Sequence, residues 1–86
     1  MAKYRIVFAP TAERQFLRLT KVVRLRVAQA IAKLAADPHL GKRLKGELAD
    51  YWSFRIGDYR VVYFIRNNLV QVEIIRVAHR REAYRG

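Results

Sequence analysis

Apolar residues recur with two different periods along the chain, and the change of period separates helices from strands. Residues 3–8 alternate loosely between polar and β-branched or aromatic types, which predicts a first strand from Lys3 to Phe8. Pro10 ends this strand and suits the first turn of a helix. We therefore predict a helix from Pro10 to Leu19, whose buried stripe consists of Ala12, Phe16 and Leu19.

A second helix is predicted from Lys21 to Ala36. Its apolar positions recur three and four residues apart, so that they share one side of the cylinder: Val23, Val27, Ala30, Ile31 and Leu34. Asp37 and Pro38 end the helix, because the residue before a proline is disfavoured in helical conformation. The two helices are expected to form a hairpin over one face of a sheet.

Three further strands follow, Tyr51–Ile56, Tyr59–Arg66 and Leu69–Ala78, with only Gly57-Asp58 and Asn67-Asn68 between them. Glycine favours a type II′ turn and asparagine tolerates the positive φ of a type I′ turn, so both separators predict two-residue hairpins. The fold class is thus α+β, one domain over residues 1–86 with the order β-α-α-β-β-β. The helix hairpin covers one face of a mainly antiparallel sheet, and a basic C-terminal tail or short helix follows.

Two-residue turns fix strand register, so the cross-strand pairs can be predicted. Arg55 faces Arg60 in the first hairpin, and Tyr63 faces Val72 and Arg60 faces Ile75 in the second. Because side chains alternate between faces, the core face comprises Trp52, Phe54, Ile56, Tyr59, Val61, Tyr63, Ile65, Val70, Val72 and Ile74. The opposite face comprises Tyr51, Ser53, Arg55, Arg60, Val62, Phe64, Gln71, Glu73 and Ile75.

Charge narrows the class of partner. The chain has 18 Lys and Arg against 7 Asp and Glu, a net charge of +11 on 86 residues. Such an excess attracts polyanions and favours RNA as the partner, the alternative being a basic surface that serves solubility alone. The absence of cysteine excludes disulfides, thiolate metal sites and thiol chemistry. No apolar run is long enough for a signal peptide or membrane span, so we expect a cytoplasmic protein without a membrane partner. We also expect no metal and no small-molecule cofactor.

Candidate chemistry gathers where Arg55 and Arg60 face each other. Two like charges directly opposite each other destabilise a sheet. The two arginines therefore either bind a phosphate together, as a clamp, or extend into water and pair with Glu73, the nearest carboxylate. The last strand is predicted to end beside the Gly57-Asp58 turn. Its tail, with His79, Arg80, Arg81, Tyr84 and Arg85, would then emerge at the same edge. The alternative is a disordered basic tail.

Several segments together resemble the RelE/ParE superfamily of toxins from type II toxin-antitoxin pairs. The resemblance covers nearly the whole chain and rests on the order of these segments: Tyr4-Arg5-Ile6-Val7-Phe8 with Pro10, Asp37-Pro38, Arg43-Leu44-Lys45-Gly46, Tyr51-Trp52-Ser53-Phe54-Arg55-Ile56, Gly57-Asp58-Tyr59-Arg60-Val61-Val62-Tyr63, and Val77-Ala78-His79-Arg80-Arg81-Glu82-Ala83-Tyr84-Arg85. The ending is more similar to the RelE branch than to ParE proteins that poison DNA gyrase.

The resemblance implies a ribosome-dependent mRNA endonuclease and a cognate antitoxin. The cleavage it implies is metal-free: the ribose 2′-hydroxyl attacks the adjacent phosphorus and leaves a 2′,3′-cyclic phosphate and a 5′-hydroxyl. Arg55 and Arg60 would hold the scissile phosphate, Arg80 would bind phosphate or donate a proton, and Tyr84 would match the catalytic tyrosine. We expect the remaining RNA contacts from Lys42, Arg43, Lys45, Tyr51, Ser53, Arg81 and Arg85.

The chain departs from the family pattern at Ser53 and Arg55, where the best-known member has lysines. A guanidinium deprotonates poorly, so we expect His79 or Tyr84 to act as the base. The alternatives are that Tyr84 only stacks on a base, His79 only caps the strand end, and Glu73 only neutralises arginines. Two other functions stay open: a ParE-like gyrase inhibitor, and a noncatalytic RNA-binding module in which Tyr51 and Phe64 stack on bases.

Overall fold

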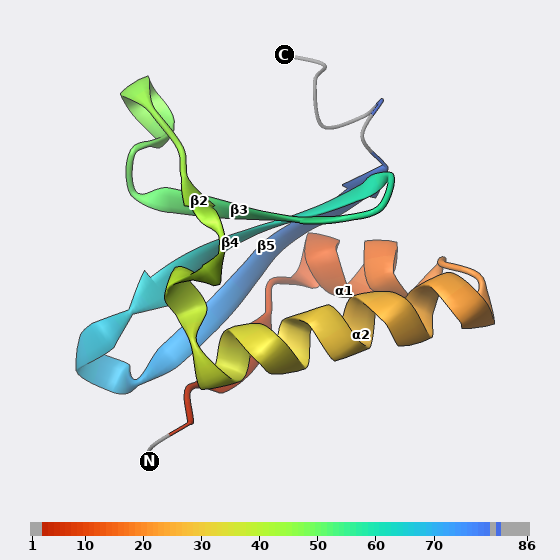
Figure 1. Ribbon diagram of the computed structural model, residues 1–86, viewed down its shortest axis with the longest axis horizontal. Helices are drawn as coiled ribbons and strands as arrows, with labels where there is room; N and C mark the ends of the chain where they lie inside the picture. The colour runs from red at the N-terminus through yellow and green to blue at the C-terminus, as the bar shows by residue number, and fades with distance from the viewer. Residues whose placement is uncertain (1–2, 80, 82–86) are drawn as a thin grey trace.

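Two helices pack against one face of a five-stranded sheet in the computed structural model, which describes residues 3–79 and residue 81 (Figure 1). The elements are β1 (Arg5–Phe8), α1 (Pro10–Leu17), α2 (Lys21–Ala36), β2 (Lys42–Arg43), β3 (Tyr51–Ile56), β4 (Tyr59–Arg66) and β5 (Gln71–His79), with 3-10 turns η1 (Pro38–Leu40), η2 (Gly46–Leu48) and η3 (Asn67–Leu69). The sheet order is β1-β5-β4-β3-β2. Among the strands of the described residues, only the pairing of β1 with β5 is parallel. The predicted α+β fold is confirmed.

Both predicted helices are present, and their predicted stripes pack against the core, although Phe16, Leu19 and Val23 are only partly buried. Pro10 opens α1, which ends at Leu17 rather than Leu19. Thr20 caps α2, its hydroxyl accepting a hydrogen bond from the amide of Val23 at 3.4 Å. The α2 stripe packs with Ala12 and with residues of β4 and β5 into one core, whose fully buried members include Val27, Leu34, Val61, Tyr63, Val72 and Ile74.

The first hairpin has the predicted register. Arg55 pairs with Arg60 and Phe54 with Val61. Gly57 has a φ of 57°, whereas Asp58 has no positive φ, since among the described non-glycine residues only Val70 has one. This combination fits a type II′ turn with glycine at its first central position. The two facing arginines are therefore fixed by a local turn.

The predicted register of the second hairpin is wrong because its loop is longer than two residues. Residues 67–69 form a 3-10 turn, and Val70 follows in left-handed conformation (φ 49°, ψ 52°) with its amide bonded to the carbonyl of Asn67 at 3.1 Å. Arg66 consequently pairs with Gln71, and Tyr63 pairs with Ile74 rather than with Val72. Val70, predicted in the core, is exposed.

A β-bulge displaces the register once more, between Val62 and Tyr63. Tyr63 pairs with Ile74 but Val62 pairs with Arg76, so that Ile75 is the extra residue. From that point the faces of β5 are exchanged relative to the prediction, and Arg60 lies opposite Ala78 instead of Ile75. The bulge places Arg76 on the open face of the sheet and Val77 in the core.

The basic connector after α2 contains a strand that the sequence did not predict. Lys42 pairs with Ser53 and Arg43 with Trp52, which makes β2 an edge strand of two residues. Such a strand is too short to show alternation, so its pairing depends on contacts made elsewhere in the fold. Figure 1 shows the chain after β2 rising on the side of the sheet opposite the helices.

Candidate nucleic-acid interface

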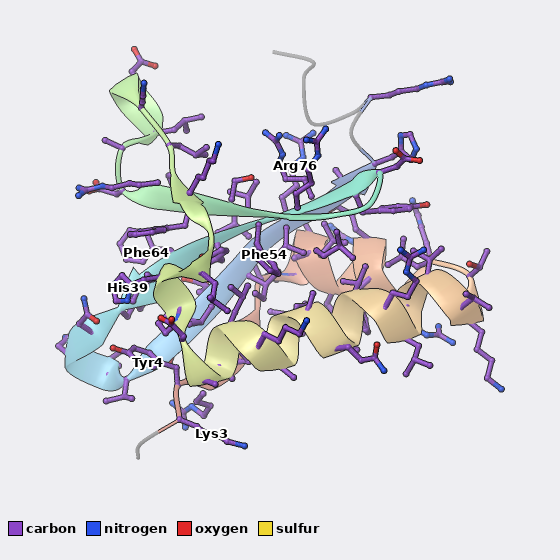
Figure 2. All side chains as sticks on the ribbon, viewed as in Figure 1. Lys3, Tyr4, His39, Phe54, Phe64 and Arg76 are labelled. Carbon is purple, nitrogen blue, oxygen red and sulfur yellow. The ribbon has the colours of Figure 1, made fainter. Side chains whose placement is uncertain are left out.

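Three arginines from three adjacent strands share the open face of the sheet. Arg55 of β3 is directly opposite Arg60 of β4, a geometry that brings the Cβ atoms to about 5 Å. Arg76 of β5 is opposite Val62, which makes it the diagonal neighbour of Arg60, at about 7–8 Å. In Figure 2, Arg76 points away from the helices, whereas Phe54 lies on the helix side of the sheet. The open face therefore carries a row of guanidinium groups.

A hollow of about 480 Å³ lies between the connector and the arginine pair. Its lining joins the connector to β3 and β4: Leu40, Gly41, Lys42, Arg43, Leu44, Lys45, Ser53, Phe54, Arg55 and Arg60. Six of the predicted RNA-contacting or phosphate-holding residues thus surround one space, although Ser53 is itself buried and offers little surface. The structure brings the connector and the predicted clamp together.

A second hollow, of about 410 Å³, lies on the other side of Arg60. Its lining is mostly apolar and consists of Leu44, Leu48, Tyr51, Arg60, Val62, Ile75 and Arg76. Arg60 and Leu44 line both hollows. The open face is thus a groove with a basic compartment, a ridge at Arg60, and an apolar compartment that Arg76 completes.

The hydroxyl of Tyr63 anchors the start of the connector. Tyr63 is fully buried, donates a hydrogen bond to the carbonyl of Pro38 at 2.6 Å, and accepts one from the amide of Gly41 at 3.2 Å. Burial raises the pKa of Tyr63 to about 12, the Gly41 amide opposing this rise and Asp37 adding to it. A Cβ on Gly41 would lie only 2.5 Å from the tyrosine oxygen, so the chain passes where only glycine fits.

Glu73 does not lie beside the arginine pair, contrary to expectation. Its carboxylate accepts a hydrogen bond from Arg66 at 2.9 Å, and the Arg66 guanidinium lies over the ring of Phe64 at 4.9 Å. Glu73 is paired with Phe64, four residues along β4 from Arg60, which corresponds to about 13 Å. The negative charge of Glu73 therefore compensates the charge of Arg66 at the far end of the open face.

His79 ends β5 beside the Gly57-Asp58 turn, as predicted, but its ring lies on the other side of the sheet from Arg55 and Arg60. It pairs with Tyr59, whose ring it meets edge-on at 5.2 Å, and lines a hollow with Gln15, Arg18 and Leu19 of the helix hairpin. Its Nδ1 accepts the amide of Arg81 at 3.3 Å. Arg81 is exposed, while Arg80, Tyr84 and Arg85 lie outside the described residues.

Arg76 is the site residue that the sequence prediction missed. Strict alternation after Ile74 assigns it to the core face, where an unpaired charge would be costly. That conflict between alternation and charge, next to the apolar residues Val77 and Ala78, is the sequence signal that indicates a bulge.

Within residues 3–79 and 81, no group of three or more His, Asp and Glu side chains could hold a metal ion. In the same part of the chain no helix is long and apolar enough to cross a membrane.

Known proteins similar to this chain are toxins. The family model described as the ParE toxin of the type II toxin-antitoxin system parDE matches residues 6–84. Two proteins of Mycobacterium tuberculosis are similar over 84 residues. Toxin RelE is 40% identical, covering 95% of this chain and 87% of the relative. Toxin RelG is 37% identical, covering 95% and 97%.

Solved structures agree. The RelBE2 toxin-antitoxin complex of Mycobacterium tuberculosis contains a chain with a TM-score of 0.84 and 36% identity, over 92% of this chain and 93% of that one. The isolated Escherichia coli RelE toxin has a TM-score of 0.79 at 24% identity, over 88% and 83%, which shows a shared fold. With the family model matching nearly the whole chain, this protein belongs to the RelE/ParE superfamily of toxins of type II toxin-antitoxin systems.

Proposed function

We propose that this toxin is a ribosome-dependent mRNA endonuclease that inhibits translation in the cytoplasm. The observation that carries the proposal is the pairing of Arg55 with Arg60 on the open face, beside the basic connector. Two guanidinium groups in this position match the oxygens of one phosphate and stabilise the charge that builds up as the phosphorus becomes five-coordinate. The RelE relatives support the assignment to this branch.

The cleavage we propose requires no metal. The ribose 2′-oxygen forms a bond to the adjacent phosphorus while the bond from phosphorus to the 5′-oxygen breaks, which leaves a 2′,3′-cyclic phosphate and a 5′-hydroxyl. A base must take the 2′-hydroxyl proton and an acid must supply one to the 5′-oxygen. On the family resemblance we assign Tyr84 to the first transfer and Arg80 to the leaving side. Because a guanidinium deprotonates poorly, Arg80 stabilises the charge that develops on the 5′-oxygen while water supplies the proton. His79 receives no chemical step, because its ring faces the helices.

Docking on ribosomal RNA is assigned to the remaining basic residues. Lys42 and Lys45 line the basic hollow with Arg43, and all three are exposed. Arg81 and Arg85 would extend this surface from the C-terminal segment. We also propose a cognate antitoxin as partner, since solved relatives are described as RelB–RelE complexes.

Cleavage of a reporter mRNA on purified ribosomes tests the proposal. We expect Arg60→Ala and Tyr84→Phe each to reduce the cleavage rate at least 100-fold, because each removes a group that acts in the transition state. The matched control for the arginine is Arg26→Ala, an exposed residue of α2 on the far side of the sheet, which should leave the rate within twofold. Undiminished cleavage by both active-face variants would reject the assignment. RNA binding without any cleavage by the parent protein would instead indicate a noncatalytic RNA-binding module.

The second candidate function is that of a ParE-like inhibitor of DNA gyrase. It is favoured because the family model that matches residues 6–84 describes the ParE toxin. The two candidates differ in their target, since a gyrase inhibitor leaves mRNA intact and causes DNA breaks trapped by gyrase. Cell-free translation with intact mRNA, combined with trapped breaks in a gyrase assay, would replace the first proposal by the second.

A further inference from the structure

The bulge in β5 changes what the open face can bind. Without the bulge, strict alternation from Ile74 would place Ile75 on the open face and turn Arg76 toward the core. With it, Ile75 and Arg76 both line the apolar hollow, together with Arg60. A bulge that re-aims a charged side chain beside a candidate site suggests a second binding position.

The composition of this hollow fits one nucleotide of a single strand. Leu44, Leu48, Val62 and the ring of Tyr51 supply apolar surface on which a base can stack or be buried. Two guanidinium groups, Arg60 and Arg76, flank this surface and suit phosphates. Their diagonal placement, at about 7–8 Å, matches the separation of neighbouring phosphates in an extended strand.

We propose that Arg76 and the apolar hollow form a subsite for the nucleotide next to the scissile phosphate, with its phosphate on Arg76 and its base against Tyr51, Leu48 and Val62. The inference rests on the proposed function in taking single-stranded RNA as the ligand. Among the described residues that line the hollow, none has a side-chain carboxylate or amide. The base is therefore held by stacking and burial, and its identity is not selected there. RNA would cross the ridge at Arg60 from the basic hollow into the apolar one.

Binding of RNA that cannot be cut separates this subsite from catalysis. The probe is a fluorescent RNA hexamer with 2′-O-methyl groups throughout, which removes the attacking hydroxyl. A second probe is an abasic hexamer with the same number of phosphates. Affinity of the full chain for both is measured by fluorescence anisotropy between 25 and 200 mM salt, with ~25 mM chosen because phosphate contacts are strongest at low salt.

Arg76→Gln should weaken binding of both probes at least fivefold and reduce the slope of log affinity against log salt by about 0.7, the loss of one phosphate contact. Arg26→Gln on α2 is the matched control and should change neither quantity measurably. Leu48→Ser should weaken only the probe that carries bases. Leu25→Ser removes an equally exposed leucine from α2 and should weaken neither.

Each failure has a defined meaning. Equal effects of Arg76→Gln and Arg26→Gln, or no binding of either probe at the lowest salt, would overturn the subsite. A Leu48→Ser effect on both probes or on neither would overturn the base pocket. If these binding results are as expected but the parent protein does not cut mRNA on ribosomes, the proposed function fails while the subsite stands. If mRNA is cut but Arg76→Gln binds normally, only the subsite fails.

Discussion

At the residue scale, Tyr63 links the core to the basic connector beside the open face. Its ring lies in the core, while its hydroxyl bonds to two backbone groups of the segment that leads into β2. Because the bond to Pro38 is buried and the bond from Gly41 is partly buried, their loss leaves a carbonyl and an amide without partners.

Tyr63→Phe should therefore lower the free energy of unfolding by about 1–3 kcal/mol, measured by urea denaturation at pH 7. Tyr4→Phe is the matched control, since the Tyr4 hydroxyl donates to Asn67 at 2.9 Å on the exposed surface. Its cost should stay below about 0.5 kcal/mol, because water replaces an exposed partner. Equal costs for the two variants would contradict the anchoring role of Tyr63.

The same hydroxyl predicts a loss of stability at alkaline pH. The pKa of Tyr63 is about 12 in the folded protein against 10.0 for the ordinary side chain. Folding thus favours the protonated form, and its contribution is fully present below pH 10 and is lost as pH rises from 10 to 12. Urea denaturation at pH 9 and 11.5 should show the parent protein losing more stability than Tyr63→Phe does. A parallel loss in both would reject this cause.

At the element scale, β5 continues beyond the end of β1 and needs another partner for its edge. The amide of Ala9 still reaches the carbonyl of Ile74 at 2.8 Å, after which the chain turns into α1. Gln15 of α1 then accepts the amide of Val77 at 2.8 Å, just past the bulge. The helix covers the edge that β1 leaves open and holds the strand in the register that exposes Arg76.

Gln15→Ala should cost about 1–2 kcal/mol and increase hydrogen exchange at the Val77 amide, because this partly buried donor loses its acceptor. Gln29→Ala, at an exposed position of α2, should leave stability and exchange unchanged. Unchanged protection of Val77 in Gln15→Ala would show that β4 alone fixes the bulge.

At the scale of the whole molecule, positive charge is present on both sides of the sheet, but the open side gathers several basic residues around one hollow: Lys42, Arg43, Lys45, Arg55 and Arg60. On the helix side, Arg18 and Arg26 each line a separate hollow, while the exposed residues Lys21 and Lys33 line neither of these two. We therefore expect charge on the two sides to contribute differently to ribosome binding.

The double variant Lys42→Gln, Lys45→Gln should reduce the salt slope of ribosome binding by about two and weaken binding at least tenfold at ~100 mM salt, if each lysine contacts one phosphate as proposed. Lys21→Gln, Lys33→Gln removes the same charge from α2 and should have less than half of that effect. Sedimentation with ribosomes over a salt series measures both. Equal slopes would mean that net charge alone drives docking.

The sequence by itself determined the features that depend on neighbouring residues. The two helices follow from apolar spacing and from Pro10, Thr20 and Pro38. The facing pair Arg55 and Arg60 follows from a two-residue turn, whose geometry leaves one register. Family membership could also be recognised from segment order alone.

Tertiary structure decided the features whose partners are distant in the chain. The two-residue strand β2 is held by Tyr63, 22 residues beyond Gly41. The amide after the bulge is satisfied by Gln15, which is 62 residues away. The pattern of neighbouring residues does not show which distant residue a segment will contact. A single extra residue in a strand also moves every later side chain to the other face of the sheet. The arginine pair was therefore predictable, whereas Arg76 beside it was decided by the fold.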